Sequence, residues 1–155
     1  MIPPLDHRGL LPAGVHLGTW KEIKAAFGTD PRREDLIGNA EKLSSTTLAQ
    51  LHPSPLFLAG STFSDKGRPN DIEATIKVDP KKLSQAQLVA VLQLQGMHDI
   101  IKNAMEVDFY VTIEQPGAND FSLFFQYVGE KTALAKNLQP KDKRGVVEVE
   151  TWLTP

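Results

Sequence analysis

Two acidic residues, Asp71 and Glu73, stand one position apart at the start of an apolar stretch, a short loop after a Gly60-Ser61 pair. Alternate residues of a β-strand point to the same side, so we expect the two carboxylates to face together. Carboxylates held close repel each other unless a cation lies between them, and Mg²⁺ combines carboxylate oxygens with water and phosphate. The spacing therefore predicts a magnesium site beside a turn that can hold the phosphates of a nucleoside triphosphate.

The Gly60-Ser61 pair supplies the phosphate side of this hypothesis. Gly60 has no side chain, so the backbone can approach a phosphate closely there. Ser61 can donate its hydroxyl and its amide to a phosphate oxygen at the start of a helical turn. In the following loop, Lys66 and Arg68 can contact a triphosphate as a point charge and a planar fork, or they can be solvated residues of a turn.

A third acid, Asp108, lies inside the apolar stretch 107–113. An ionised carboxylate is costly to bury without a partner, so its position calls for an explanation. We expect it to be a ligand of a second metal ion, roughly 3.5–4 Å from the first, or the base that deprotonates an acceptor hydroxyl. The alternatives are that Asp108 forms a buried ion pair with a lysine, and that Glu73 is a solvated residue paired with Lys77.

The strands that would position these acids are marked by their hydrophobic patterns. Residues 56–59 are uniformly apolar, as in a central strand, whereas residues 72–78 alternate between apolar and polar side chains. Strands are expected at residues 56–59, 72–78, 107–113 and 146–149.

The helices are marked by their N-terminal caps. Thr19 and Glu22 form a capping box, Asp30 and Pro31 suit the start of a second helix, and Ser84 caps a third. Helices are expected at residues 20–27, 31–51 with a break near 44–47, 85–105 and 121–128.

These elements predict an α+β fold in which a small mixed sheet is flanked by helices. Residues 1–18 are rich in proline and glycine and are expected to form an extended N-terminal arm. Residues 19–155 are short enough to form a single domain.

The composition limits the classes of function. The chain has 155 residues, of which 41% are hydrophobic and 23% charged, and its net charge of −2 gives no overall attraction to nucleic acid or to anionic membranes. The absence of cysteine excludes disulfides and thiolate zinc sites. There is no long apolar run and no signal pattern at the N-terminus, so we expect a complete cytoplasmic protein with no membrane association.

The order of these features resembles the DNA polymerase beta-type nucleotidyltransferase superfamily in its minimal form. The shared pattern is a Gly-Ser turn, a loop and an Asp-x-Asp/Glu pair within Gly60–Val78, followed by the acid Asp108 in an apolar strand. A wider likeness, through residues 2–14 and 119–127, links the chain to small uncharacterised bacterial proteins grouped with that superfamily.

The resemblance implies a nucleotidyltransferase-like fold and a set of roles. Asp71, Glu73 and Asp108 would bind two Mg²⁺ ions, and Gly60 and Ser61 would hold the triphosphate. The implied reaction moves a nucleoside monophosphate from a nucleoside triphosphate to an acceptor hydroxyl on a protein, an RNA or a small molecule. Glu73 departs from the usual aspartate, although some antibiotic nucleotidyltransferases share the Asp-x-Glu pair, and no second domain for an acceptor is evident.

Two other kinds of function remain open. A catalytically weak or inactive domain could act through a partner protein, as in toxin–antitoxin or phage-defence modules, and a gene for a small helical toxin next to this one would favour that role. A nucleotide sensor would bind nucleotide without releasing pyrophosphate.

Three further groups of residues carry weaker signals. A basic C-terminal stretch can bind phosphate or an RNA acceptor, or it can be a solvated surface. The aromatic residues between positions 121 and 127 are expected in a helix core, not as a base-stacking platform, and the four histidines show no metal-ligand spacing. The basic C-terminal stretch named first consists of Lys131, Lys136, Lys141, Lys143 and Arg144.

Overall fold

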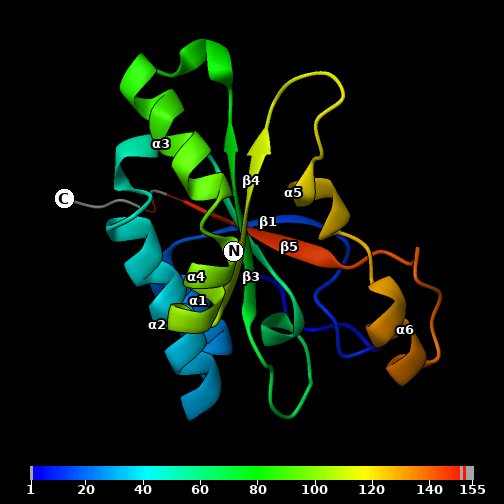
Figure 1. Cartoon of the computed structure of the whole chain (residues 1–155). Coiled ribbons are helices and arrows are strands. Elements are labelled where there is room, and N and C mark those ends of the chain that lie inside the picture. The colour runs from blue at the N-terminus through cyan, green and yellow to red at the C-terminus, as the bar shows by residue number, and fades with distance from the viewer. Residues whose placement is uncertain (1, 151, 153–155) are drawn as a thin grey trace.

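A computed structural model of the chain describes residues 2–150 and residue 152. Five strands form one mixed sheet in the order β1-β5-β2-β3-β4, and β1 and β5 lie side by side in Figure 1. The strands are β1 (Gly14–Gly18), β2 (Leu56–Ala59), β3 (Ile72–Val78), β4 (Val107–Ile113) and β5 (Gly145–Val149).

The pairing of the strands fixes which side chains become neighbours. β1 runs parallel to β5, β2 runs antiparallel to both β5 and β3, and β3 runs parallel to β4. Glu73 on β3 lies opposite Ala59 on β2 and opposite Asp108 on β4. β4 is at the edge of the sheet, so a residue from outside the sheet can reach around it.

The longer helices cover the two faces of the sheet unequally. In Figure 1, α1 to α4 lie on one side of the strands and α5 and α6 on the other. The helices are α1 (Trp20–Phe27), α2 (Pro31–Ser45), α3 (Gln85–Gln95), α4 (His98–Met105), α5 (Phe121–Phe124) and α6 (Gly129–Lys136). Short 3₁₀ turns occur at Ala49–Leu51, Ser61–Phe63 and Pro80–Lys82.

The main hydrophobic core fills the space between the sheet and α1 to α4. Apolar residues at alternate positions of the strands, such as Leu58, Ile76 and Phe109, pack there against helix residues such as Leu36 and Ile101. Because strand side chains alternate, the intervening residues point to the opposite face. That face carries Glu73, Thr75, Lys77, Asp108 and Tyr110.

Most of the expected elements are confirmed. The strands at 56–59, 72–78 and 107–113 have the predicted bounds, and the last strand begins one residue before the predicted 146. Thr19 and Glu22 form the expected capping box, and the side chains of Asp30 and Ser84 cap α2 and α3. The architecture is therefore mixed α/β, compatible with the expected α+β class.

The prediction of an extended N-terminal arm over residues 1–18 is wrong in part. Gly14–Gly18 form β1, whose backbone pairs with β5. Leu10 and Leu11 are buried, and Leu11 belongs to the main core. The proline and glycine residues that favoured an arm mark the turns that lead into this strand. Residue 1 and residues 151 and 153–155, which the arm and the single domain also included, lie outside the described residues.

Two helix boundaries also differ from the prediction. The helix expected at 85–105 is interrupted between Gln95 and His98, because the backbone turns at Gly96. The helix expected at 121–128 ends at Phe124, and α6 follows after Val128. None of the helices among the described residues combines the length and the apolar character needed to cross a membrane.

Candidate functional site

The structure brings Asp71, Glu73 and Asp108 to one face of the sheet. Glu73 and Asp108 are direct neighbours across the parallel pair β3 and β4, and Asp71 precedes β3. Burial raises the pKa of Asp71, and the negative charge of Asp108 raises it further. Burial likewise raises the pKa of Glu73, and both aspartates add to the effect. The three carboxylates therefore repel one another, as the spacing predicts.

Lys102 lies between two of the carboxylates. Its Nζ atom is 3.7 Å from Oδ2 of Asp71 and 3.9 Å from Oδ1 of Asp108. Lys102 belongs to α4, on the opposite face, and it reaches the carboxylates because β4 is an edge strand. Its side chain is 46% exposed, so it can move away when another cation approaches.

His98, the first residue of α4, contacts the same carboxylate. Its Nε2 lies 2.5 Å from Oδ1 of Asp108, and its Nδ1 lies 3.1 Å from Oδ1 of Asp99. Burial alone would lower the pKa of His98, but the hydrogen bonds to Asp108 and Asp99 outweigh burial and raise it. The ring also packs on Tyr110, whose pKa rises to about 12 through burial and the nearby charge of Asp108.

Arg144, just before β5, is the partner of Glu73. Nη2 of Arg144 is 3.6 Å from Oε2 of Glu73, and its Nε donates a 3.5 Å hydrogen bond to the carbonyl of Phe125. Burial lowers the pKa of Arg144 although Glu73 opposes the change, so for both partners burial outweighs their mutual attraction. The alternative pairing of Glu73 with Lys77 is wrong, because Lys77 contacts Asp120 and Glu114.

The donor atoms of this cluster suit Mg²⁺, which prefers carboxylate oxygens and retains water in its shell. Within the part of the chain that the structure describes, no three or more His, Cys, Asp or Glu side chains are grouped closely enough to hold a metal ion. The positive charges there come from Lys102 and Arg144. Asp71 and Glu73 are therefore the two acids of the cluster that could offer oxygens to a cation in the adjoining cleft, and with Asp108 they do not form a ready-made three-ligand site.

Gly60 has the conformation that a close approach requires. Its φ of 97° and ψ of −170° lie in a region that is nearly restricted to glycine. A Cβ atom at this position would lie 3.3 Å from Cγ of Glu73, so the absent side chain leaves space for the longer acid. Ser61 begins the 3₁₀ turn that follows, as expected for a residue at the start of a helical turn.

We expect Gly60→Ala to lower the free energy of unfolding by about 2–3 kcal/mol, because it adds backbone strain to crowding against Glu73. Gly117→Ala is the matched control: φ at Gly117 is 82°, and nothing lies within 4 Å of an added Cβ. We expect the control to lose only about 1 kcal/mol. Urea denaturation of both variants measures the difference, and equal losses would show that crowding against Glu73 is unimportant.

A buried arginine, Arg33, organises the loop after Ser61. Its side chain is only 8% exposed and donates hydrogen bonds to the carbonyl oxygens of Thr62, Ser64 and Lys66 at 2.6–2.9 Å. It also donates a 3.3 Å bond to the carbonyl of Ser61. The guanidinium group of Arg33 therefore holds the backbone of the loop that was predicted to bind phosphate.

A cleft of about 680 Å³ opens beside the acids, between the loop and the segment from α5 to α6. Asp71, Glu73 and Ser61 line it, whereas Asp108, on the edge strand β4, is not among the residues that line it. Cationic side chains line the cleft as well, and they come from segments far apart in the sequence. They are Lys66, Lys131, Lys136 and Arg144.

The predicted basic residues are thus divided by the structure. Lys66 lines the cleft, but Arg68 does not; after the contact with Arg32, the positive charge of Arg68 also helps to lower the pKa of Glu106. Of the C-terminal stretch, Lys141 and Lys143 also lie outside the described lining of the cleft.

Sequence reasoning missed His98 and Lys102 as members of the site. The two residues are four positions apart on α4, so they share one helix face, and that spacing was the available signal. Nothing in the sequence indicated that β4 would be an edge strand, which is what allows both side chains to reach Asp108.

Comparison with known proteins adds a family but no activity. Residues 3–150 match a model described as a family of unknown function, DUF6932. No curated protein matches the chain significantly. No solved structure matches it significantly either. Because the match extends over nearly all of the sequence, the chain belongs to the family of unknown function DUF6932.

Proposed function

We propose that the protein is a magnesium-dependent nucleotidyltransferase, which moves a nucleoside monophosphate from a nucleoside triphosphate to an acceptor hydroxyl and releases pyrophosphate. The observation that carries the proposal is the arrangement of three acids beside the Gly60-Ser61 turn: Asp71 just before β3, Glu73 on β3, and Asp108 opposite Glu73 on β4. Burial and mutual repulsion raise the pKa values of Asp71 and Glu73, and a divalent cation between carboxylates would relieve that repulsion.

The acids would have different tasks in this reaction. Asp71 and Glu73 line the cleft and would hold Mg²⁺, which neutralises phosphate charge and polarises the phosphoryl group. Asp108 lies on β4, the edge strand, and its carboxylate would accept the proton of an acceptor hydroxyl that approaches from that side. The acceptor oxygen forms a bond to the α-phosphorus, the bond to the bridging oxygen breaks, and pyrophosphate leaves with its electrons.

The cationic residues of the cleft would bind the triphosphate. Lys131 lies close enough to Asp71 for its positive charge to oppose the rise of that carboxyl's pKa. Lys66 and Arg144 add two more positive charges, and Ser61 can donate its hydroxyl to a phosphate oxygen. A cleft lined by both acids and cations favours a phosphate chain bound between metal and protein.

Isothermal titration of the four nucleoside triphosphates with and without Mg²⁺ tests the proposal. We expect binding that requires Mg²⁺, because the acids repel a triphosphate when no cation lies between them. Titrations with MgCl₂ alone give the background. Absence of binding by all four nucleotides in Mg²⁺ would contradict the proposed function.

A second candidate is a catalytically inactive domain that acts through a partner protein, and one observation favours it. Lys102, His98 and Arg144 already neutralise the three acids without any metal ion. Glu73→Asp distinguishes the candidates, since the shorter acid restores the usual metal ligand and releases Arg144. If Glu73→Asp releases pyrophosphate faster than wild type, the protein is an enzyme with a weakened site. If neither wild type nor the variant releases pyrophosphate, the partner role is favoured.

A further inference from the structure

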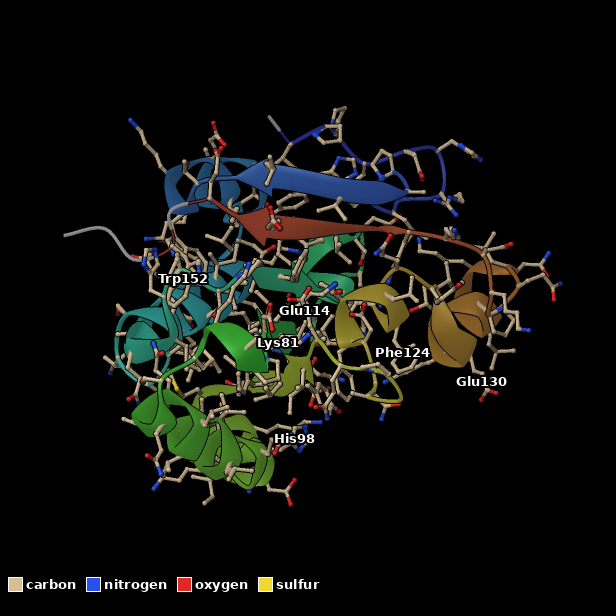
Figure 2. All side chains as sticks on the ribbon, turned by 90° about the horizontal axis from the view of Figure 1, so that it is seen from above. Lys81, His98, Glu114, Phe124, Glu130 and Trp152 are labelled. Atoms are coloured by element: carbon tan, nitrogen blue, oxygen red, sulfur yellow. The ribbon has the colours of Figure 1, made fainter. Side chains whose placement is uncertain are left out.

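We infer that the cleft holds a nucleobase against an aromatic wall formed by Phe124 and Tyr127. This inference rests on the proposed function and names how the nucleotide is recognised. The wall belongs to the segment between α5 and α6, and Figure 2 shows Phe124 beside α5 on the side that faces α6. Phe124 and Tyr127 both line the cleft of about 680 Å³, a size within the range of nucleotide sites.

Phe124 is exposed although the nearby aromatic residues Phe121 and Phe125 are packed. Phe125 is 8% exposed and packs with Phe57 and Val146, and Phe121 stacks on Tyr110 with ring centroids 4.5 Å apart. These contacts satisfy the apolar face of α5. Phe124 remains 50% exposed at the wall of the cleft, so the core does not account for it.

The ring of Phe124 is nevertheless held in place. It contacts Phe121 edge to face, with centroids 5.9 Å apart and an interplanar angle of 89°. An edge-to-face contact uses the rim of one ring and leaves at least one ring face for another partner. A base can stack on a ring that is already oriented, because little side-chain entropy is lost on binding.

Backbone hydrogen bonds also connect the segment of the aromatic wall to the segment that carries Arg144. The amide of Arg144 donates to the carbonyl of Gln126, and the amide of Val128 donates to the carbonyl of Asp142. Tyr127 forms an isolated antiparallel bridge with Lys143. The backbone that carries the aromatic side chains is therefore paired with the backbone that carries Arg144, so base and phosphate contacts are fixed relative to each other.

The lining of the cleft offers groups for each part of a nucleotide. A planar base would lie on Phe124 and Tyr127, and the phosphates would lie near Lys131 and Arg144, next to the acids. Stacking uses the π-face that every base possesses, so discrimination among the four bases should be small.

The test compares ATP with inorganic tripolyphosphate, which has the phosphates but no base, by isothermal titration in Mg²⁺. For Phe124→Ala we expect ATP to bind about 5- to 100-fold more weakly, while the affinity for tripolyphosphate stays within about twofold. Phe124→Trp keeps an aromatic face and should restore ATP binding. Leu123→Ala is the matched control, because Leu123 is 45% exposed on the same helix but does not line the cleft.

Each outcome decides the inference. If Phe124→Ala weakens the binding of ATP and of tripolyphosphate equally, the ring only supports the phosphate site. If ATP binding is unchanged in this variant, the base lies elsewhere. Either result overturns the inference of an aromatic wall for the base. If wild type binds tripolyphosphate but no nucleotide, the base wall is wrong and the anion site remains. If wild type binds neither ligand, the proposed function fails, and the base wall fails with it.

Discussion

Replacing Arg33 with methionine is expected to lower the free energy of unfolding by about 3–5 kcal/mol. Methionine fills much of the same volume but donates no hydrogen bond. The carbonyl oxygens of Thr62, Ser64 and Lys66 would lose their donor in a buried environment. Asp30, which pairs with Arg33 at 2.9 Å and caps α2, would also lose its partner.

Urea denaturation followed by circular dichroism measures this loss. Lys24→Met is the matched control, because Lys24 forms an ion pair with Glu41 while remaining 48% exposed. Exposed pairs contribute little, so we expect the control to change stability by less than about 1 kcal/mol. An Arg33 variant no less stable than the control would show that the loop after Ser61 holds its shape without the guanidinium group.

The second expected result concerns Asp71→Asn, which should reduce magnesium-dependent pyrophosphate release by about 100-fold or more. Asparagine keeps the shape of the side chain but removes the charge that would hold Mg²⁺. Because Asp71 lines the cleft and lies outside the main core, the fold should survive the change. Pyrophosphate release by purified protein measures the loss, and Asp35→Asn, at an exposed position on α2, is the control. Full activity in Asp71→Asn would remove this acid from the proposed mechanism.

The same variant should be more stable than wild type at pH 7. Burial and the charge of Asp108 raise the pKa of Asp71, while Lys102, Lys131 and Lys66 only partly oppose the rise. An acid with a raised pKa binds its proton more tightly in the folded state, so stability falls as pH rises from the ordinary aspartate value of about 3.9 through the raised value. Asparagine does not titrate and avoids this loss.

The free energies of unfolding of wild type and Asp71→Asn at pH 3 and pH 7 test whether the variant is the more stable protein. The advantage of Asp71→Asn over wild type should be present at pH 7 and absent at pH 3, where Asp71 is protonated in both states. A variant less stable than wild type at pH 7 would mean that the contact with Lys102 outweighs burial and repulsion. A gain in stability with a loss of activity is typical of a site that is strained for function.

The sequence was sufficient for the parts of the fold that local patterns determine. The alternation in Ile72–Val78 placed Glu73 on the polar face, and the apolar surroundings of Asp108 marked a second strand. The caps at Thr19 and Ser84 located two helix starts. In each case the signal lies within a few residues of the feature that it predicts.

The sequence alone could not predict contacts that depend on the order of the strands in the sheet. His98 and Lys102 reach Asp108 only because β4 is at an edge, and Arg144 reaches Glu73 only because β5 enters beside β2. The role of α5 was also misjudged, since the aromatic residues expected in a helix core include one that stays exposed. These contacts depend on long-range pairing, which no local pattern records.

The position of β5 between β1 and β2 has a consequence for how the protein is made. A ribosome releases β1 and β2 long before it synthesises β5, so neither strand has its neighbour on that side while the chain is growing. Arg144 and the segment paired with the aromatic wall arrive with β5. The nascent chain therefore exposes unpaired strand edges, which favour aggregation, until β5 is inserted, and its cleft lacks Arg144 until the same moment.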